Sequence, residues 1–406
     1  MDALTTPLNW QKVRLGDIAE IIGGGTPSTQ VTSFWNGSIN WFTPTEIGIT
    51  KYVYKSQRTI TPLGLKKSSA KLLPIGTILL TSRASIGDCA ILKEVATTNQ
   101  GFQSLIPLEK INNEFLYYLI LTLKNKLLKL ASGSTFLEVS PNKIKNLLIP
   151  LPPLNEQIAI ANILSGLDRY LYALRALILK KECVKKALSF ELLSQRKRLK
   201  GFNQAWQKVR IGDIGITISG LVGKTKQDFI NGNAKYITFL NVLNNVIIDT
   251  SILENVKIYP NEKQNSFKKY DLFFNTSSET PKEVGMCAVL LDDIDQVFLN
   301  SFCFGFRIFD KAVDSLFLSY LINSEIGRKA FENLAQGSTR YNLSKSGFNN
   351  VCLFLPPLNE QIAIANILSA LDNEIISLKN KKRQFENIKK ALNHDLMSAK
   401  IRVLEE

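Results

Sequence analysis

Hydrophobic residues recur with heptad spacing in two stretches of the chain. In the first stretch the apolar positions are 4, 3, 4, 3 and 4 residues apart, which predicts an α-helix with a coiled-coil seam. A second stretch near the end of the chain keeps the same rhythm. The first seam is Ile160, Leu164, Leu167, Leu171, Leu174 and Ile178, and the second is Ile364, Leu368, Leu371, Ile375, Leu378, Lys382 and Phe385, continuing through Leu392 and Leu396.

Proline pairs mark where both helices are expected to begin. Pro152-Pro153 and Pro356-Pro357 stand just before the seams, and proline fits the first turn of a helix because its missing N–H has no partner there. Asn155 and Asn359 follow as cap or first-turn residues.

The first helix is expected to end near Gly201, because glycine commonly follows the last turn of a helix. Each helix then spans about 45 residues, or about 65 Å at the usual rise per residue. Two shorter helices with a break near Lys180 are the alternative.

The two seams belong to a tandem repeat. The fourteen letters PPLNEQIAIANILS occur at 152–165 and recur unchanged at 356–369, 204 positions later. A second shared word, WQKVR followed by Leu or Ile and then GDI, occurs at 10–18 and 206–214. Each half therefore has a tryptophan-containing start, a long variable region and a helix. We expect globular regions at 1–151 and 201–355, and repeated helices at 152–200 and 356–406.

The repeat predicts the fold if an approximate two-fold axis relates the two halves. The first helix runs from the first globular region to the second, so the second helix must run back. The expected fold class is therefore α+β, with two similar mixed α/β domains joined by two long antiparallel coiled-coil helices in pseudo-two-fold symmetry. Such a molecule is a dumb-bell whose chain termini lie close together.

The globular regions share a framework and differ in their loops. Buried strands are expected at Gly76–Thr81 and Tyr270–Asn275. The first strand continues as LLTSRASIG and the second as FFNTSSETPKEVG, a loop about four residues longer with a different charge pattern. This pattern favours two modules that recognise different targets on one scaffold, and neutral drift of surface loops is the alternative.

Charge indicates the class of target. The chain of 406 residues carries a formal net charge of +15, which raises the local concentration of polyanions and points to nucleic acid. A biased genome composition is the alternative explanation. Basic residues are concentrated in the tract Arg175–Lys200, which predicts a helix with a positive surface.

The sequence offers little material for catalysis. The only histidine is His394, on the expected second helix, and the five cysteines are scattered without a CxxC pair, so we expect no metal site and reduced, mostly buried thiols. Gly223-Lys224-Thr225 lacks the first glycine of a phosphate-binding loop, since position 218 is Ile218. No methyltransferase signature occurs either. We therefore expect a protein that is not an enzyme and needs no cofactor.

Polar loop residues are the candidates for DNA contact. Arg83 suits guanine, the amides of Asn99 and Gln100 suit adenine, and Ser278 and Glu279 could accept from cytosine. Loop-stabilising hydrogen bonds or phosphate contacts are the alternative for each. The expected DNA-contacting residues are Thr26, Ser28, Ser82, Arg83, Ser85, Asn99, Gln100, Ser134 and Thr135 in the first region, and Lys224, Lys226, Ser278, Glu279, Lys282, Thr339, Arg340 and Tyr341 in the second.

These motifs together resemble the specificity subunit of type I restriction-modification enzymes. The resemblance covers essentially the whole chain, including GGGTPST at Gly23, TSRASIG at Thr81 and TNQGF at Thr98. It implies that each variable region is a target recognition domain for one half of a split, asymmetric site in double-stranded DNA. It also implies that the helices set the gap between half-sites and bind two methyltransferase subunits, with nuclease-translocase subunits joining outside. The second region departs more, because it lacks the GGGTP start.

Identical polar letters in the repeat predict where a partner binds. Packing alone would require only the apolar letters to match, so matching polar letters suggest one surface presented twice. Recent duplication or recombination is the competing explanation. The expected partner-binding residues are Asn155, Glu156, Gln157 and Asn162, with Asn359, Glu360, Gln361 and Asn366 in the second copy.

A stand-alone two-headed DNA-binding or architectural protein is the alternative function. No apolar run reaches eighteen residues and the N-terminal letters lack a signal peptide's pattern, so we expect a cytoplasmic protein without membrane insertion.

The repeat generates a test of the topology. A circular permutant opened near Lys200, with the original termini joined, should fold and function, because the two-fold arrangement brings the termini together. Solubility and activity of the permutant are the measurements, and an insoluble or inactive product would count against the topology.

Overall fold

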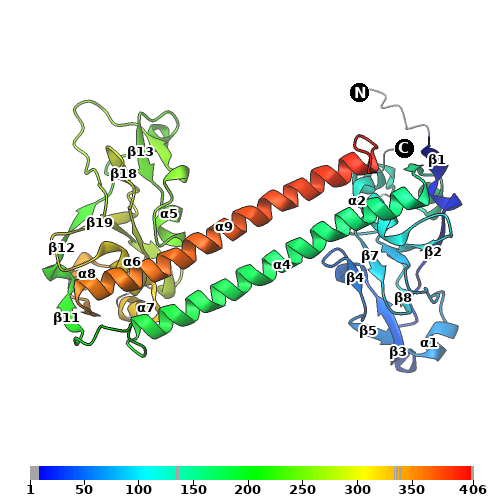
Figure 1. Cartoon of the computed structure of the whole chain (residues 1–406), viewed down its shortest axis with the longest axis horizontal. Coiled ribbons are helices and arrows are strands. Elements are labelled where there is room, and N and C mark those ends of the chain that lie inside the picture. The colour runs from blue at the N-terminus through cyan, green and yellow to red at the C-terminus, as the bar shows by residue number, and fades with distance from the viewer. Residues whose placement is uncertain (1–8, 134–136, 333, 335–336, 338–340, 404–406) are drawn as a thin grey trace. The chain divides into compact units, whose positions relative to one another are not determined.

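The computed structural model describes residues 9–403, apart from 134–136, 333, 335–336 and 338–340 (Figure 1). The chain divides into two compact units, and each unit contains part of both long helices. Unit 1 comprises Met1–Arg175 and Asn380–Glu406, and unit 2 comprises Ala176–Lys379. Among the described residues, no helix is both long and apolar enough to cross a membrane.

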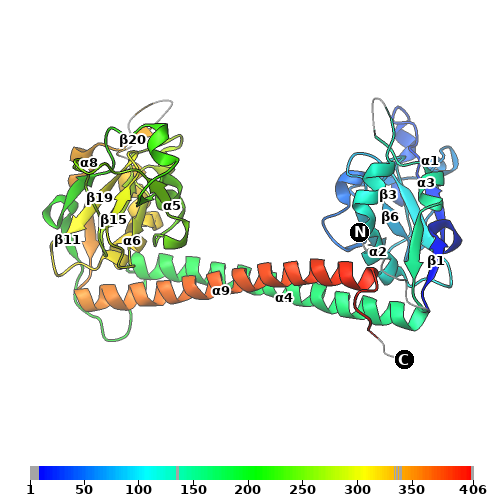
Figure 2. The same cartoon turned by 90° about the horizontal axis from the view of Figure 1, so that it is seen from above.

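Unit 1 contains a five-stranded sheet, a three-stranded sheet and a buried helix (Figure 2). The larger sheet has the order β2-β9-β6-β7-β4, and the smaller sheet has the order β5-β3-β8. Helix α2 packs on β6 and β7, and its first turn is capped by Asn112, whose side chain accepts from the Phe115 N–H. The elements are β2 (Ala19–Gly23), β3 (Trp35–Phe42), β4 (Tyr52–Val53), β5 (Arg58–Ile60), α1 (Pro62–Lys66), β6 (Ile78–Leu80), β7 (Cys89–Leu92), β8 (Ala96–Thr98), β9 (Gln103–Pro107), α2 (Asn113–Leu130) and α3 (Pro141–Lys145).

Unit 2 repeats this plan with changes at the edges. Its main sheet has the order β12-β19-β15-β17, and a three-stranded sheet has the order β14-β13-β18. Asp314 caps α6 as Asn112 caps α2. The elements are β12 (Gly215–Ser219), β13 (Ala234–Ile237), α5 (Phe239–Asn244), β14 (Glu254–Val256), β15 (Leu272–Asn275), β16 (Ser277–Ser278), β17 (Cys287–Val289), β18 (Val297–Leu299), β19 (Cys303–Ile308), α6 (Ser315–Asn323), α7 (Glu325–Glu332), β20 (Tyr341–Asn342) and α8 (Lys345–Asn349). The strands expected at 76–81 and 270–275 are confirmed as β6 and β15.

The two long helices are α4 (Leu154–Leu193) and α9 (Leu358–Met397), each of 40 residues. The alternative of a break near Lys180 is therefore wrong. The expected end near Gly201 is also wrong, because the chain turns earlier: Gln195 has a φ of +62°, and the Lys197 N–H bonds to the Glu191 carbonyl at 3.1 Å. His394 lies exposed on α9, as expected.

The helices pair antiparallel within each unit, and the contacts repeat. In unit 1, Asp168 of α4 meets Lys389 of α9. In unit 2, the positions 204 residues away form the same pair, Asp372 with Lys185 at 2.5 Å. The pair Arg175–Glu386 of unit 1 at 3.0 Å likewise recurs as Lys379–Glu182 of unit 2 at 2.6 Å. The α+β class and the antiparallel, symmetric pairing of the helices are confirmed, while the dumb-bell shape stays a prediction.

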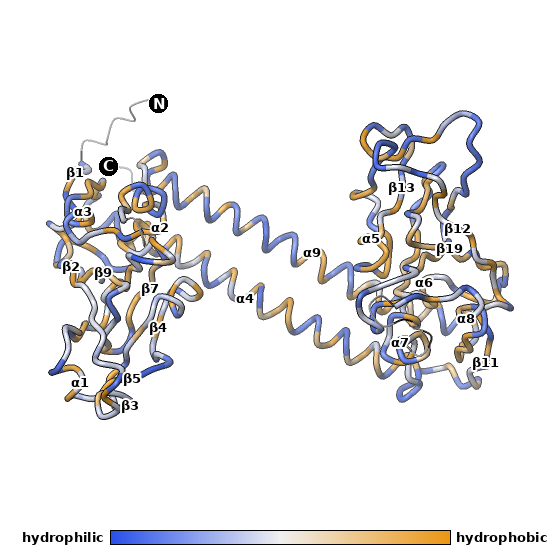
Figure 3. Tube along the Cα trace, turned by 180° about the vertical axis from the view of Figure 1, so that it is seen from behind, coloured by the Kyte–Doolittle hydropathy of each residue, from blue (hydrophilic) through white to orange (hydrophobic). Residues whose placement is uncertain are grey.

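Apolar seam positions bind the helices to the units. Ile160 and Leu164 of α4 are buried in the unit 1 core together with Leu396 of α9. In the unit 2 core, Ile364 and Leu368 of α9 are buried with Leu192 and Leu193 of α4. Figure 3 shows apolar and polar residues alternating along both helices. Each core therefore contains the start of one helix and the end of the other.

The other repeated word forms a strand beside each helix start. Strand β1 (Gln11–Arg14) pairs antiparallel with β10 (Leu148–Leu151), which leads directly into α4. Strand β11 (Gln207–Arg210) pairs in the same way with β21 (Cys352–Leu355), which leads into α9. The two repeated words of the sequence are therefore neighbours in space.

Buried glutamates fasten each helix start to the end of the other helix. The side chain of Glu156 is 2% exposed, accepts from Trp10 Nε1 at 3.1 Å and bonds Arg402 at 2.8 and 3.1 Å. Glu360, at 1% exposed, bonds Arg198 at 2.7 and 2.6 Å. Arg198 and Arg402 are themselves 204 positions apart. We call these two sets the Glu–Arg clamps.

The neighbouring glutamines fasten the helix start to its own domain. Gln157 accepts from the Asn112 N–H at 2.9 Å and donates to the carbonyls of Lys110 and Pro152. Gln361 accepts from the Asp314 N–H at 2.9 Å and donates to the carbonyls of Ala312 and Pro356. Two of the three repeated letters NEQ, the glutamate and the glutamine, are therefore needed for internal hydrogen bonds in both copies.

The clamps generate a stability prediction. Glu360→Gln should lower the stability of the full chain by roughly 1–3 kcal/mol, because the amide cannot neutralise the half-buried Arg198. Thermal unfolding is the measurement, and Asn359→Ala, at the exposed neighbouring position, is the matched control. Equal melting temperatures for the two variants would contradict the role of the clamp.

Candidate nucleic-acid interface

Three loops meet at the same place in both units, and hydrogen bonds define their equivalence. In unit 1 the Ser82 N–H donates to the Gly101 carbonyl at 2.8 Å, and the Val139 N–H donates to the Ser82 carbonyl at 3.1 Å. In unit 2 the Thr276 N–H donates to the Phe302 carbonyl at 3.0 Å, and the Leu343 N–H donates to the Thr276 carbonyl at 2.8 Å. We use the name loop platform for the loops at Ser82, Gly101 and Val139 of unit 1, with the segment at Gly24 beside them. The loop platform of unit 2 consists of the loops at Thr276, Phe302 and Leu343, with the segment at Gly220.

An asparagine organises the loop that follows β8 in unit 1 and β18 in unit 2. Asn99 Oδ1 accepts from the Gly101 N–H at 2.8 Å, and Asn300 Oδ1 accepts from the Phe302 N–H at the same distance. This is a side-chain-to-backbone turn, which fixes the loop locally. Asn99 therefore supports the loop through this bond, besides its expected role in contacting adenine.

Glycine is required where the chain passes this asparagine. A Cβ on Gly24 would lie 1.9 Å from the Asn99 carbonyl oxygen, and a Cβ on Gly220 would lie 2.3 Å from the Asn300 carbonyl oxygen. The glycine-rich start of the first region therefore has a counterpart in the second, although the GGGTP letters are missing. A single glycine after a strand gave too little signal for sequence reasoning to find it, and Asn300, Ser301 and Phe302 were missed for the same reason.

The platform brings together two of the expected unit 1 contacts. The Thr26 hydroxyl donates to the side-chain carbonyl of Gln100, which is exposed. The GGGTPST and TNQGF words are thus adjacent in space. Ser28 is also exposed, and its carbonyl accepts from Trp35 Nε1 at 3.1 Å.

Arg83 lies on the surface of the platform in an ion pair. Its side chain is 41% exposed, and its Nη2 lies 2.8 Å from Glu138 Oε2. Exposed pairs of this kind are worth about 0–1 kcal/mol, so a guanine edge could replace Glu138 at small cost.

Two of the expected serine contacts in unit 1 have inward hydroxyls. Ser82 is 1% exposed and takes part in the platform through its backbone. The Ser85 hydroxyl is buried as well. This burial argues against base contact for both side chains, although neither hydroxyl has a hydrogen-bond partner among the described residues.

In unit 2 the expected residues separate into buried and exposed ones. Ser278 is buried, donates to Glu283 at 2.8 Å and pairs with Tyr341 between β16 and β20. Glu279 and Lys282 are exposed on the longer loop. The exposed side chains of this loop therefore include Glu279 and Lys282 but not Ser278.

The two lysines near position 225 differ. Lys224 is nearly buried and bonds Glu262 at 2.5 Å and the Lys257 carbonyl at 2.6 Å. The hydrogen bond from Lys224 to Glu262 is the main reason that the pKa of Glu262 is lowered to about 2. Lys224 is therefore committed to holding its loop and is not placed as a phosphate ligand. Lys226 is exposed.

Four expected contacts lie outside the described residues: Ser134, Thr135, Thr339 and Arg340. In the sequence, Ser134 and Thr135 precede the platform residue Val139 of unit 1. Thr339 and Arg340 precede the platform residue Leu343 of unit 2.

The expected partner-binding residues separate in the same way. Asn155 and Asn162 of α4, with Asn359 and Asn366 of α9, are exposed. Glu156, Gln157, Glu360 and Gln361 are buried in the bonds described above, so the interpretation of these four as partner contacts is corrected. Their identity in both copies reflects the attachment of the helix to its unit.

The positive surface expected at 175–200 is partly neutralised. Lys181 lies 2.8 Å from Glu374, and Lys185 and Arg198 are paired with acidic residues of α9. Lys180 and Lys186 remain exposed.

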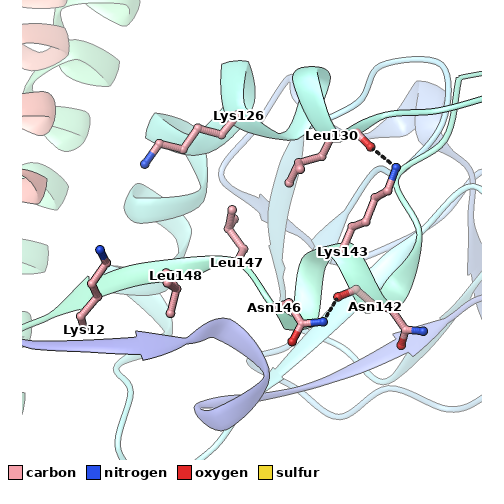
Figure 4. Close-up of a pocket in the computed structure, with 8 residues that line it drawn as sticks. All are labelled: Lys12, Lys126, Leu130, Asn142, Lys143, Asn146, Leu147 and Leu148. Carbon is pink, nitrogen blue, oxygen red and sulfur yellow. Dashed lines mark hydrogen bonds between the residues drawn. The ribbon is translucent and has the colours of Figure 1, made fainter.

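A separate hollow lies in unit 1 beside α2, α3 and β10, with a volume of about 590 Å³ (Figure 4). Its walls include Lys12, Lys126 and Leu148, and Lys143 donates from its edge to the Leu130 carbonyl at 2.8 Å. Its polar lining consists of lysine and asparagine side chains.

Three of the five cysteines are buried, in line with the expectation of mostly buried thiols. Burial raises the pKa of the thiols of Cys89, Cys287 and Cys303, whereas Cys183 and Cys352 are exposed. Within the described ranges, no group of three or more His, Cys, Asp or Glu residues could hold a metal ion.

Comparison with known proteins gives relatives along the whole chain. The MjaIX type I restriction enzyme specificity subunit of Methanocaldococcus jannaschii is 32% identical over 294 residues, 68% of each chain. The MjaVIII specificity subunit of the same organism is 27% identical and covers 99% of this chain and 95% of its own.

Solved structures show the same fold. The S subunit of a type I restriction-modification system from M. genitalium has a TM-score of 0.59 at 17% identity, with 98% of both chains covered. The HsdS subunit of Thermoanaerobacter tengcongensis has a TM-score of 0.56 at 18% identity, covering 98% of this chain and 99% of its own.

The family described as type I restriction modification DNA specificity domain matches twice, at residues 7–182 and 203–387. Each match contains one loop platform and the start of one long helix. The chain therefore belongs to the family of type I restriction-modification DNA specificity subunits.

Proposed function

We propose that each unit reads one half of a bipartite, asymmetric site in double-stranded DNA through its loop platform. One observation carries this proposal: the same backbone hydrogen bonds hold different side chains in the two units. Gln100 and Arg83 of the unit 1 platform correspond to the exposed Ser301 and the buried Ser277 of unit 2. A constant frame with different polar tips is what two different half-sites would require.

Affinity and specificity would come from different residues. Exposed lysines such as Lys226 and Lys282 would neutralise phosphates, which gives affinity that falls with salt and carries no sequence information. Arg83 and Gln100 would contact base edges in one unit, and Glu279 would accept from cytosine in the other.

The identical exposed asparagines support a second surface. We propose that Asn155 and Asn162 on α4, and Asn359 and Asn366 on α9, bind two copies of a methyltransferase subunit, with nuclease-translocase subunits joining through that complex. These residues make no clamp contact, so internal packing does not account for their identity. We expect the assembly to work in the cytoplasm. A stand-alone DNA-binding protein would not require this repeated surface.

Association with the methyltransferase tests the proposal. Asn162→Arg with Asn366→Arg should reduce the number of bound methyltransferase subunits from two toward none, because both copies of the surface then carry a bulky charge. Native mass of the co-expressed complex and methylation mapping of its DNA are the measurements.

The matched control is Gln384→Arg. Position 384 is exposed on α9, but its counterpart in the first copy is Lys180, so it is not part of the repeated surface. A complex with no methyltransferase for the unaltered chain would instead favour the stand-alone protein. A map with one continuous site would overturn the reading of two half-sites.

The helices would act as the ruler between half-sites. Deletion of seven residues from each helix, 173–179 and 377–383, keeps the heptad phase and the antiparallel register. It should shorten the mapped spacer by about three base pairs, since seven residues rise about 10 Å and each base pair about 3.4 Å. An unchanged spacer would argue against the helices as ruler.

A further inference from the structure

We propose that Phe302 is a specificity-determining residue of unit 2, and that its ring packs against the 5-methyl group of a thymine in the DNA site. The inference rests on the proposed function, because it assumes that the platform of unit 2 faces DNA. It concerns a residue to which the sequence pattern gave no role.

The backbone at Phe302 is held from two sides. Its N–H donates to Asn300 Oδ1 at 2.8 Å, and its carbonyl accepts from both the N–H and the hydroxyl of Thr276, at 3.0 and 2.8 Å. Strand β19 begins at the next residue, Cys303. The side chain therefore projects from a fixed point of the platform.

The equivalent position in unit 1 is glycine. A Cβ on Gly101 would lie 2.8 Å from Pro44 Cγ and 3.0 Å from Asn99 Oδ1, so unit 1 has no room for a side chain there. In unit 2 the same position carries an aromatic ring that is 54% exposed, beside the exposed Ser301. A glycine of one platform is thus replaced by an exposed aromatic residue in the other.

The chemistry of the ring selects its DNA contact. The base edges of the major groove present donors, acceptors and one apolar group, the thymine methyl. A phenylalanine ring cannot pair with the donors or acceptors, whereas it can bury the methyl group. Phe302 would therefore favour thymine over cytosine at one position of the site.

Removal of single methyl groups from DNA tests this contact. In duplexes that carry the methylation-mapped target, each thymine is replaced in turn by deoxyuridine, which lacks only the methyl. The complex of the unaltered chain should bind one of these duplexes about fourfold more weakly, the loss expected for one buried methyl group. The Phe302→Ala complex should bind that duplex and the parent duplex equally.

Phe309→Ala is the matched control. Phe309 is 61% exposed and follows the opposite end of β19, so its removal should leave the response to deoxyuridine unchanged. Phe302→Leu, which keeps an apolar side chain, should retain part of the response. Equal melting temperatures of the variants would show that folding is unaffected.

Three results would overturn the assignment of Phe302. They are a target without thymine, an unaltered complex that is indifferent to every deoxyuridine, and a Phe302→Ala complex that keeps the response. If the unaltered complex binds its mapped target and one of these results is obtained, only the role of Phe302 is rejected. A complex that binds no specific site would reject the proposed function as well.

Discussion

The structure depends on two buried carboxylates. A buried carboxylate that loses its cation is costly, by several kcal/mol in typical cases. Glu156 and Glu360 each obtain that cation from an arginine beyond the end of the other long helix. Neither unit is therefore complete with one helix alone. The antiparallel pairing of α4 and α9 follows from this requirement as much as from the seam, because an arginine reaches its glutamate only when the helices run in opposite directions.

Internal contacts, including the clamps, account for several letters of the repeated sequence. Within PPLNEQIAIANILS the apolar Ile160 and Leu164 enter the core, and Glu156 and Gln157 are bound internally. Asn155 and Asn162 remain exposed, as do the apolar Leu154, Ile158 and Ile163. As a member of a specificity-subunit family, the chain is a recognition protein and not a catalyst. The exposed repeated surface is therefore better explained by partner binding than by catalysis.

Sequence reasoning recovered the architecture and only part of the candidate site. The heptads, proline pairs and repeated words predicted the helices, and their pairing and the strand at Tyr270–Asn275 were confirmed. The end at Leu193 was missed, because a residue with positive φ, Gln195, stopped the helix before the glycine. The inward turn of Ser82 and the pairing of Lys224 with Glu262 were beyond reach, since both depend on contacts between segments far apart in the sequence. Letters alone also could not distinguish Glu156, which is buried, from Asn155, which is exposed.

The division of the chain into units has a consequence for synthesis. Unit 2 is one continuous segment, Ala176–Lys379, so all of its residues have been made before Leu396 and Arg402 of unit 1 exist. During translation Glu156 therefore remains without its arginine while the whole of unit 2 is able to fold. The first region of the chain to be made belongs to the last unit to be completed, and an interrupted chain would present an intact second unit beside a first unit whose core is still open.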